Sequence, residues 1–166
     1  MTSGRYLCDE MMGGLATLLR AAGHDTRLAA AGMPDGELLA LAAREERLLL
    51  TRDRALAGRA GVRGLLLRTG RADDQAVELC RARAIDWRLA PFSRCLVDNA
   101  PLRAADAHEI AGAPAASRAL PGPFRACPAC ARLYWPGSHV RRMAARLDRL
   151  SLRCAEGPHE RDATSE

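Results

Sequence analysis

Short apolar runs alternate with amphipathic stretches over the first 84 residues of the chain. The apolar runs predict four strands, at 6–8, 26–29, 48–51 and 65–67. Helical periodicity predicts four helices, at 15–22, from residue 35, over 54–59 and from residue 73 to about residue 84. Continuous apolar strands that alternate with helices are typical of a parallel sheet covered on both faces. The predicted fold class is therefore α/β.

The pattern changes near residue 90, where Ala-Pro-Phe marks a domain boundary. We expect an α/β domain over 1–90, a smaller module over 91–154 and a disordered polar tail over 155–166. The module is rich in turn residues and ends in a helix with apolar residues from Val140 to Leu150 on one face. A stripe of arginines lies on another face of that helix, at Arg142, Arg146, Arg149 and Arg153.

Charge is distributed unevenly along the chain. Residues 1–90 carry 14 Arg against 12 acidic residues, whereas 91–154 carry 10 Arg against 4 acidic residues, a net charge of +6. An anionic partner is therefore expected on the second segment, unless the arginines only form a solvated face. No apolar run approaches the ~18 residues of a membrane helix. Asp9 and Glu10 interrupt any signal-peptide pattern, so we expect a cytoplasmic protein without membrane contact.

Aspartates follow two of the predicted strands. Asp9 comes directly after the first strand and Asp53 after the third, while Asp35 and the pair Asp73 and Asp74 begin predicted helices. Strand ends and following helix starts share one edge of a parallel sheet, so we expect these acids to meet in one cleft. Carboxylates there would hold Mg²⁺ or Mn²⁺. The alternative for Asp35 and Asp73 is helix capping, whereas strand ends have no such need for acids.

Cysteines in the second segment have the spacing of metal ligands. Cys127 and Cys130 form a Cys-x-x-Cys turn, and Cys95 and Asp98 repeat the spacing with a carboxylate in the second place. Zinc accepts three thiolates and a carboxylate oxygen, so these four residues form a candidate Zn²⁺ site. The alternatives are a fourth ligand from His139 or Cys154, or a degenerate turn without metal. Cys8 and Cys80 lie in apolar patterns and are expected to be core residues, since disulfides are rare in the cytosol.

Several strings of this chain resemble the Mut-seven C-terminal RNase domain family. They are 6–16 (YLCDEMMGGLA), 49–54 (LLTRDR), the segment from Ser93 to Leu102, and 127–139, with its Tyr-Trp-x-Gly-Ser-His ending. The resemblance covers about residues 5–150 and implies a PIN-like ribonuclease domain with an appended zinc ribbon. It also implies that Asp9, Asp35, Asp53 and Asp73 or Asp74 match the PIN acidic positions, and that the three cysteines match zinc ligands. Asp98 departs from the family pattern, which has Cys there.

These observations together predict a divalent-metal-dependent endoribonuclease that cleaves single-stranded RNA with a metal-activated water. Asp9 and Asp53 would be the main metal ligands, and Asp35, Asp73 and Asp74 would complete the cluster. RNA would be held by arginines, namely Arg52, Arg54, Arg142, Arg146 and Arg149. Tyr134 and Trp135 would pack the ribbon, with base stacking as the alternative. The alternative functions are a non-catalytic RNA-binding module and a toxin-like regulatory protein, whose protein partner the sequence does not identify.

Overall fold

The computed structural model describes residues 4–156 of the chain. The predicted tail falls largely on 157–166 and so lies mostly outside the described residues. The first part of the fold contains β1 (Arg5–Cys8), η1 (Glu10–Met12), α1 (Gly13–Ala22), β2 (Asp25–Leu28), α2 (Asp35–Arg44), β3 (Leu48–Thr51), α3 (Arg54–Ala60), η2 (Gly61–Arg63), β4 (Gly64–Leu66) and α4 (Ala72–Ala82). The second part contains β5 (Arg103–Ala104), α5 (Ala107–Ala111), α6 (Ala115–Arg118), β6 (Arg125–Ala126), β7 (Leu133–Tyr134) and α7 (Ser138–Ala155).

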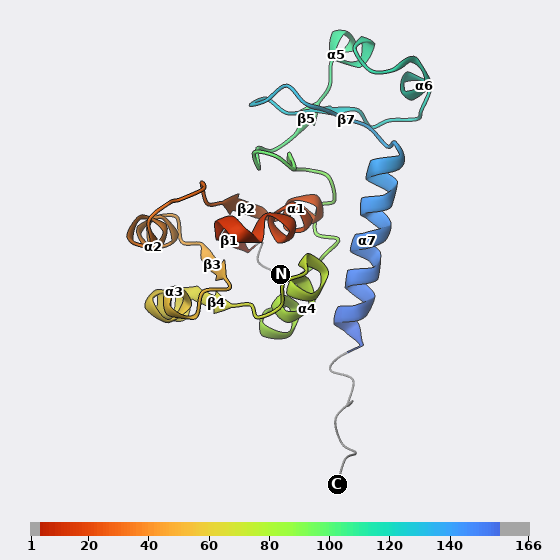
Figure 1. The fold of residues 1–166 in the computed structure, drawn as a ribbon. Coiled ribbons are helices and arrows are strands. Elements are labelled where there is room, and N and C mark those ends of the chain that lie inside the picture. Colours follow the sequence, from red (N-terminus) through yellow and green to blue (C-terminus); the bar gives the residue numbers. More distant parts are fainter. Residues whose placement is uncertain (1–3, 157–166) are drawn as a thin grey trace.

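The four longer strands form one parallel sheet in the order β2-β1-β3-β4 (Figure 1). Alternate side chains of the central strands point to opposite faces. Cys8 and Leu50 face a core shared with α1 and α4, while Leu7 and Leu49 face a second core beneath α2 and α3. The prediction of an α/β fold with helices on both faces is confirmed. Gly23, at φ 100°, ends α1 as its position in the sequence predicts.

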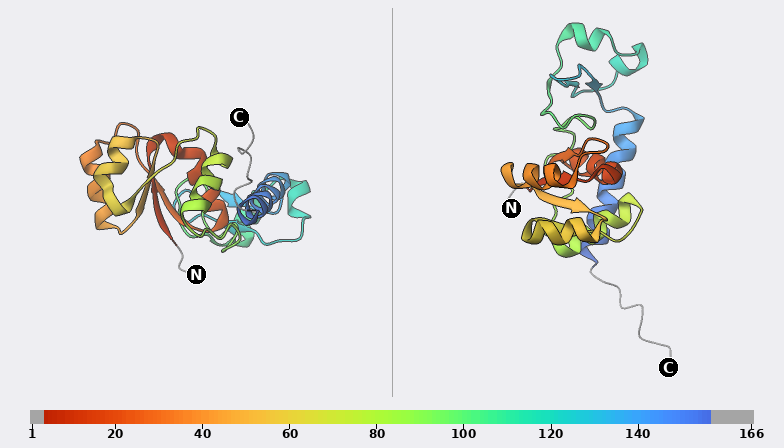
Figure 2. Two further views of the ribbon diagram at one scale, coloured as in Figure 1. Left: turned by 90° about the horizontal axis from the view of Figure 1, so that it is seen from below. Right: turned by 60° about the vertical axis from the view of Figure 1, so that its left-hand side comes forward.

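Residues 103–134 build a small ribbon-like module at one end of the molecule (Figure 2). Its sheet is antiparallel, in the order β5-β6-β7, and each strand has two residues. From the ribbon the chain returns through α7, which runs beside α1 and α4 (Figure 1). Leu147 and Leu150 of α7 are buried in the core of the α/β domain. The last helix, predicted as part of the second module, therefore packs on the first.

A disulfide joins Cys80 of α4 to Cys154 of α7. The sequence pattern predicted Cys80 as an unpaired core residue and left Cys154 as an alternative zinc ligand, and the structure corrects both expectations. The packing of α7 on α4 brings the two sulfurs together, beneath the indole N–H of buried Trp87. Cys8, in contrast, is a fully buried free thiol, as predicted, and burial raises its pKa to about 12.

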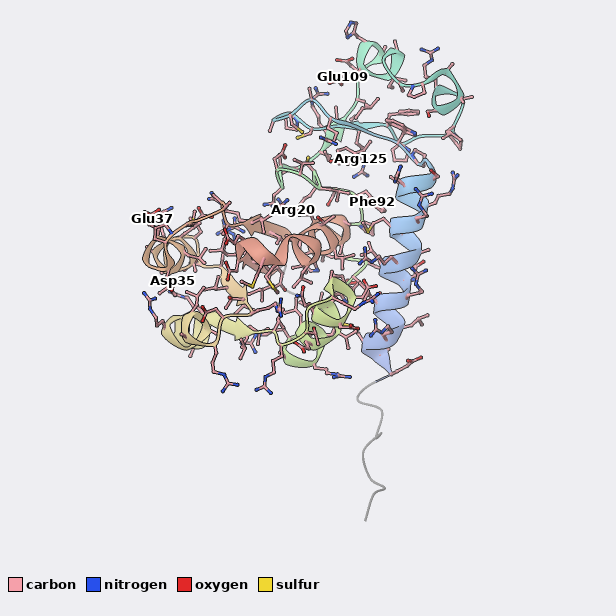
Figure 3. All side chains as sticks on the ribbon, in the orientation of Figure 1. Arg20, Asp35, Glu37, Phe92, Glu109 and Arg125 are labelled. Atoms are coloured by element: carbon pink, nitrogen blue, oxygen red, sulfur yellow. A yellow bond between two sulfur atoms is a disulfide. The ribbon has the colours of Figure 1, made fainter. Side chains whose placement is uncertain are left out.

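Arg20 fastens the second part of the chain to the first. Its buried guanidinium donates to the carbonyl oxygens of Leu96 and Val97, at 3.0 and 2.8 Å, and to that of Thr26 at 2.8 Å (Figure 3). The Asn99 side chain reinforces the junction by donating to a carboxylate oxygen of Asp25 at 2.7 Å. Across residues 4–156, no helix is long and apolar enough to cross a membrane.

Candidate functional site

Two of the predicted acids follow adjacent strands, β1 and β3, at the carboxyl edge of the parallel sheet. Asp9 follows β1 and is nearly buried, and one of its carboxylate oxygens accepts a hydrogen bond from the Thr51 hydroxyl at 2.6 Å. The same Thr51 oxygen accepts the backbone N–H of Asp53 at 3.0 Å. The Thr51 hydroxyl therefore connects the Asp9 carboxylate with the backbone of Asp53, and it holds that carboxylate in a fixed orientation.

Both strand-end aspartates also cap a helix. An oxygen of Asp9 accepts the N–H of Glu10 at 2.8 Å, and Oδ1 of Asp53 accepts the N–H groups of Ala55 and Leu56 at the start of α3. For Asp35 and Asp73, helix capping was the alternative to a place in the acidic cluster, and neither residue caps its helix. The residues that precede α2 and α4 are Pro34 and Arg71, and no side chain caps either helix.

The remaining predicted acids form ion pairs with arginines. Asp35 pairs with Arg59 at 2.8 Å, on the α2–α3 side of the molecule (Figure 3). Asp73 and Asp74 of α4 pair with two arginines of α7, Arg146 at 2.7 Å and Arg153 at 3.0 Å. Within residues 4–156 the acids of the sheet edge do not form a group of three or more with the ligand spacing of a metal site. The expected convergence of four elements is therefore absent from this conformation.

The predicted arginines of the RNA surface have different surroundings. Arg52 and Arg54 are exposed beside Asp53, and Arg149 is exposed on α7. Arg142 is also exposed and contacts His139 at 3.0 Å. Arg146 is half-buried in its ion pair with Asp73, so its charge is already neutralised.

The predicted cysteine group does assemble. The ligand atoms of Cys95, Asp98, Cys127 and Cys130 all lie within 4.8 Å of one another. The sulfurs of Cys95 and Cys130 are 3.8 Å apart, and the Cys127 sulfur is 3.3 Å from each oxygen of Asp98. Two thiolates bound at about 2.3 Å to a tetrahedral zinc ion are roughly 3.8 Å apart. The group has the composition and spacing of a four-coordinate metal site.

Two turns with the same backbone build this group. In each turn the first cysteine exchanges hydrogen bonds with residues four and five positions later: Asn99 and Ala100 after Cys95, and Ala131 and Arg132 after Cys127. Asn99 and Ala131 both have positive φ angles, of 69° and 55°. Asp98 therefore occupies, in the first turn, the place that Cys130 occupies in the second.

Hydrogen bonds shift the pKa values of three residues of the cysteine group. The thiol of Cys130 and the N–H of Ala100 stabilise the Asp98 carboxylate and hold its pKa at about 2. The same carboxylate raises the pKa of Cys130 to about 11. Burial opposes ionisation of Cys95, but hydrogen bonds from the Tyr134 hydroxyl and from nearby backbone N–H groups lower its pKa. The Tyr134 hydroxyl lies 3.1 Å from the Cys95 sulfur, whereas His139 is turned toward Arg142.

Sequence reasoning missed three residues of these sites, namely Thr51, Tyr134 and Arg20. Thr51 is the one polar residue in the apolar run of β3. A lone polar residue at the end of a buried strand indicates a side chain with a hydrogen-bonding role. The Tyr134 hydroxyl contacts the Cys95 sulfur and accepts the N–H of Leu96, although the sequence predicted only packing or base stacking for this residue. Arg20 lies on the buried side of α1, and only the tertiary contact with Leu96 and Val97 reveals its role.

A family model described as the Mut7-C RNAse domain matches residues 4–147. The match includes both the sheet edge and the cysteine group, and the chain belongs to the Mut7-C RNAse domain family. Membership of this family points to a nuclease with RNA as its substrate. Neither a comparison with curated proteins nor one with solved structures finds a match.

Proposed function

We propose that the chain is a divalent-metal-dependent endoribonuclease that cleaves single-stranded RNA at the sheet edge of Asp9 and Asp53. One observation carries the proposal: in a chain of an RNAse family, two aspartates flank a shared hydroxyl at the carboxyl ends of neighbouring parallel strands. This edge is where open α/β sheets bind their ligands.

The donor set suits a hard cation. Asp9 offers two carboxylate oxygens, each with one hydrogen-bond donor and a remaining lone pair, and Asp53 caps α3 through Oδ1. Mg²⁺ and Mn²⁺ need only one or two carboxylates, because water fills the remaining positions. When bound, the cation would supply Lewis-acid stabilisation of the phosphoryl oxygens and would lower the pKa of a coordinated water.

The chain's own groups perform the remaining tasks. Thr51 orients the Asp9 carboxylate, and the exposed guanidinium groups of Arg52 and Arg54 flank Asp53, where they would hold RNA phosphates. Asp35, Asp73 and Asp74 would join the site only after their ion pairs with arginine open. Arg142 and Arg149 would extend the phosphate contacts along α7.

The cysteine group is proposed as a structural Zn²⁺ site. Three sulfur ligands favour zinc over magnesium or calcium, and a closed set of four ligands leaves no open position for substrate. Zinc here would join the ribbon's turn over 127–132 to the turn over 95–100, which Arg20 of α1 holds.

The ribonuclease proposal is tested with labelled single-stranded RNA and Mn²⁺. We expect the full chain to produce fragments with 3′-hydroxyl and 5′-phosphate ends. Asp9→Asn and Asp53→Asn should each lower the cleavage rate about a hundredfold or more, since each removes a cation ligand. The matched control is Asp148→Asn, an exposed residue of α7 whose one ion pair is with Arg88. Equal cleavage by all four proteins would show that the activity belongs to another site or to a contaminant.

A second candidate function is a non-catalytic RNA-binding module. It is favoured by the pairing of Asp35, Asp73 and Asp74 with arginines and by the helix-capping bonds of Asp9 and Asp53. This alternative predicts salt-dependent RNA binding in the absence of added Mg²⁺ or Mn²⁺, with no turnover when either is supplied. Cleavage that disappears in Asp9→Asn would exclude it.

A further inference from the structure

An apolar groove borders the ribbon where β7 leads into α7. It consists of two neighbouring cavities of about 130 and about 720 Å³ that share Tyr134, Trp135 and Val140. Phe92 and Pro136 line the smaller cavity, which lies well below the roughly 300 Å³ of a typical small-molecule site. A space of this size and lining fits one flat ring better than a whole ligand.

The position of the Trp135 ring in this groove depends on Gly137. A Cβ atom at Gly137 would stand 2.8 Å from the indole Nε1, so the ring occupies space that only a glycine leaves free. Trp135 is half-buried, and the adjacent Tyr134 is committed through its hydroxyl to Cys95 and Leu96. Both rings line the groove, but the Tyr134 ring is held in place by its hydroxyl, so Trp135 is the better candidate for contact with a ligand.

Phe92, which lines the smaller cavity, is held in place by hydrogen bonds of its backbone. Phe92 adopts a left-handed conformation, with φ at 56°, which is unfavourable for an aromatic residue. Its N–H donates to the carbonyl of Ala21 at 2.8 Å, and its own carbonyl accepts from the Arg125 guanidinium at 3.1 Å (Figure 3). These two bonds fix Phe92 and place a cation at the edge of the same cavity.

The charges along the groove have one sign. Arg125 lines the smaller cavity, and Arg132 and Arg141 line the larger one. Among residues 4–156, those that line the two cavities include no aspartate or glutamate. Aromatic rings beside guanidinium groups are the combination that single-stranded nucleic acids require, because bases stack while phosphates pair with the cations. An apolar peptide would use the rings but would gain nothing from the three guanidinium groups.

We propose that this groove binds unpaired bases of single-stranded RNA, with a base stacked on Trp135 and adjoining phosphates on Arg125, Arg132 and Arg141. The proposal rests on the ribonuclease function proposed above and gives the ribbon a role in it. RNA held here would be anchored on the ribbon while another part of the strand reaches the sheet edge.

The test uses the full chain in a non-cleaving Asp9→Asn background and two labelled probes. One is an oligouridylate of about 12 nucleotides, and the other is a ribose-phosphate chain of equal length and charge that lacks bases. We expect Trp135→Leu to weaken binding of the oligouridylate roughly tenfold and to leave binding of the abasic chain unchanged. Trp135→Phe should restore most of the affinity because it keeps an aromatic face. Leu152→Ala, an exposed apolar residue of α7 outside the groove, is the control.

Intrinsic fluorescence supplies a second measurement. Trp87 is buried, so quenching by oligouridylate should come from Trp135 and disappear in Trp135→Leu. Equal binding of the two probes, or full affinity in a Trp135→Leu protein with an unchanged melting temperature, would overturn the proposal in favour of an apolar peptide as occupant. Failure of the ribonuclease proposal is detected separately: a protein that binds bases through Trp135 but never cleaves RNA supports the groove alone.

Discussion

The cysteine group and the acidic sheet edge differ in how completely they assemble. Both were predicted as metal sites from residue type and spacing. In the folded chain, Cys95, Asp98, Cys127 and Cys130 bring their ligand atoms together, whereas only Asp9 and Asp53 of the five acids are linked, through Thr51. Asp35, Asp73 and Asp74 are neutralised by arginines of neighbouring elements.

The difference follows from the number of elements that each site requires. The cysteine group needs two tight turns with equivalent backbone hydrogen bonds, and each turn positions two candidate ligands locally. The acidic cluster needs side chains from four separate elements, and arginines on adjacent helices compete for them. Asp35, Asp73 and Asp74 are each at least one-third exposed, and the cation that each carboxylate pairs with is a guanidinium group.

Removal of a thiolate should have the largest effect on the ribbon. Because structural zinc sites couple metal binding to folding, Cys127→Ser should lose its bound zinc, from about one equivalent to almost none, and should unfold the ribbon. Elemental analysis and limited trypsin digestion measure this, with faster cleavage expected after Arg118 and Arg132. Cys8→Ala, in the α/β core, is the matched control and should keep its metal. Intact zinc in Cys127→Ser would contradict the assignment.

Replacement of Asp98 by cysteine tests whether this residue contacts the metal. Asp98→Cys should strengthen zinc binding several-fold, because a fourth thiolate is a softer ligand than an oxygen. Competition with a chromophoric chelator measures the change in affinity. An affinity equal to that of the unmodified chain would mean that Asp98 does not contact the metal, in spite of its place in the first turn.

Acid should weaken the contact of Asp25 with Asn99, which joins the second part of the chain to the first. Burial raises the pKa of Asp25, but hydrogen bonds from Arg47 and Asn99 outweigh burial and lower the pKa to about 2. The unfolded chain titrates this group near 3.9, so its contribution to stability is complete above about pH 5 and is lost as the pH falls toward 2. Urea unfolding between pH 7 and 3 should show a shallower acid loss in Asp25→Asn. Asn99→Ala should give an intermediate slope, and identical slopes in all three proteins would refute this account.

The ion pair between α4 and α7 should have the smallest effect. Arg146 and Asp73 are each about one-third exposed, so a double-mutant cycle with Arg146→Gln and Asp73→Asn should give a coupling energy of about 0.5 kcal/mol. RNA cleavage measured on the same variants tests the acidic site. A large loss of cleavage in Asp73→Asn alone, at unchanged stability, would show that Asp73 belongs to the nuclease site. The acidic site would then be more completely assembled than the ion pairs indicate.

Much of the fold was predictable from local pattern. The β-α alternation, the end of α1 at Gly23 and the burial of Leu147 and Leu150 all follow from periodicity and turn chemistry, which act within a few residues. The disulfide between Cys80 and Cys154 was not predictable, because it depends on the side of the domain to which α7 returns. The role of Arg20 was hidden for the same reason, since its partners at Leu96 and Val97 are remote in the sequence.

Local sequence patterns were enough to predict the parallel α/β architecture, the strand-end positions of Asp9 and Asp53, and the two turns that carry the cysteine group. Each depends on residues close together in the chain. Packing between remote segments settled which aspartates form ion pairs with arginine, which cysteines form a disulfide and which aromatic residue of the groove contacts the cysteine group. Those outcomes depend on the partner that packing brings within bonding distance, and no local pattern encodes that partner.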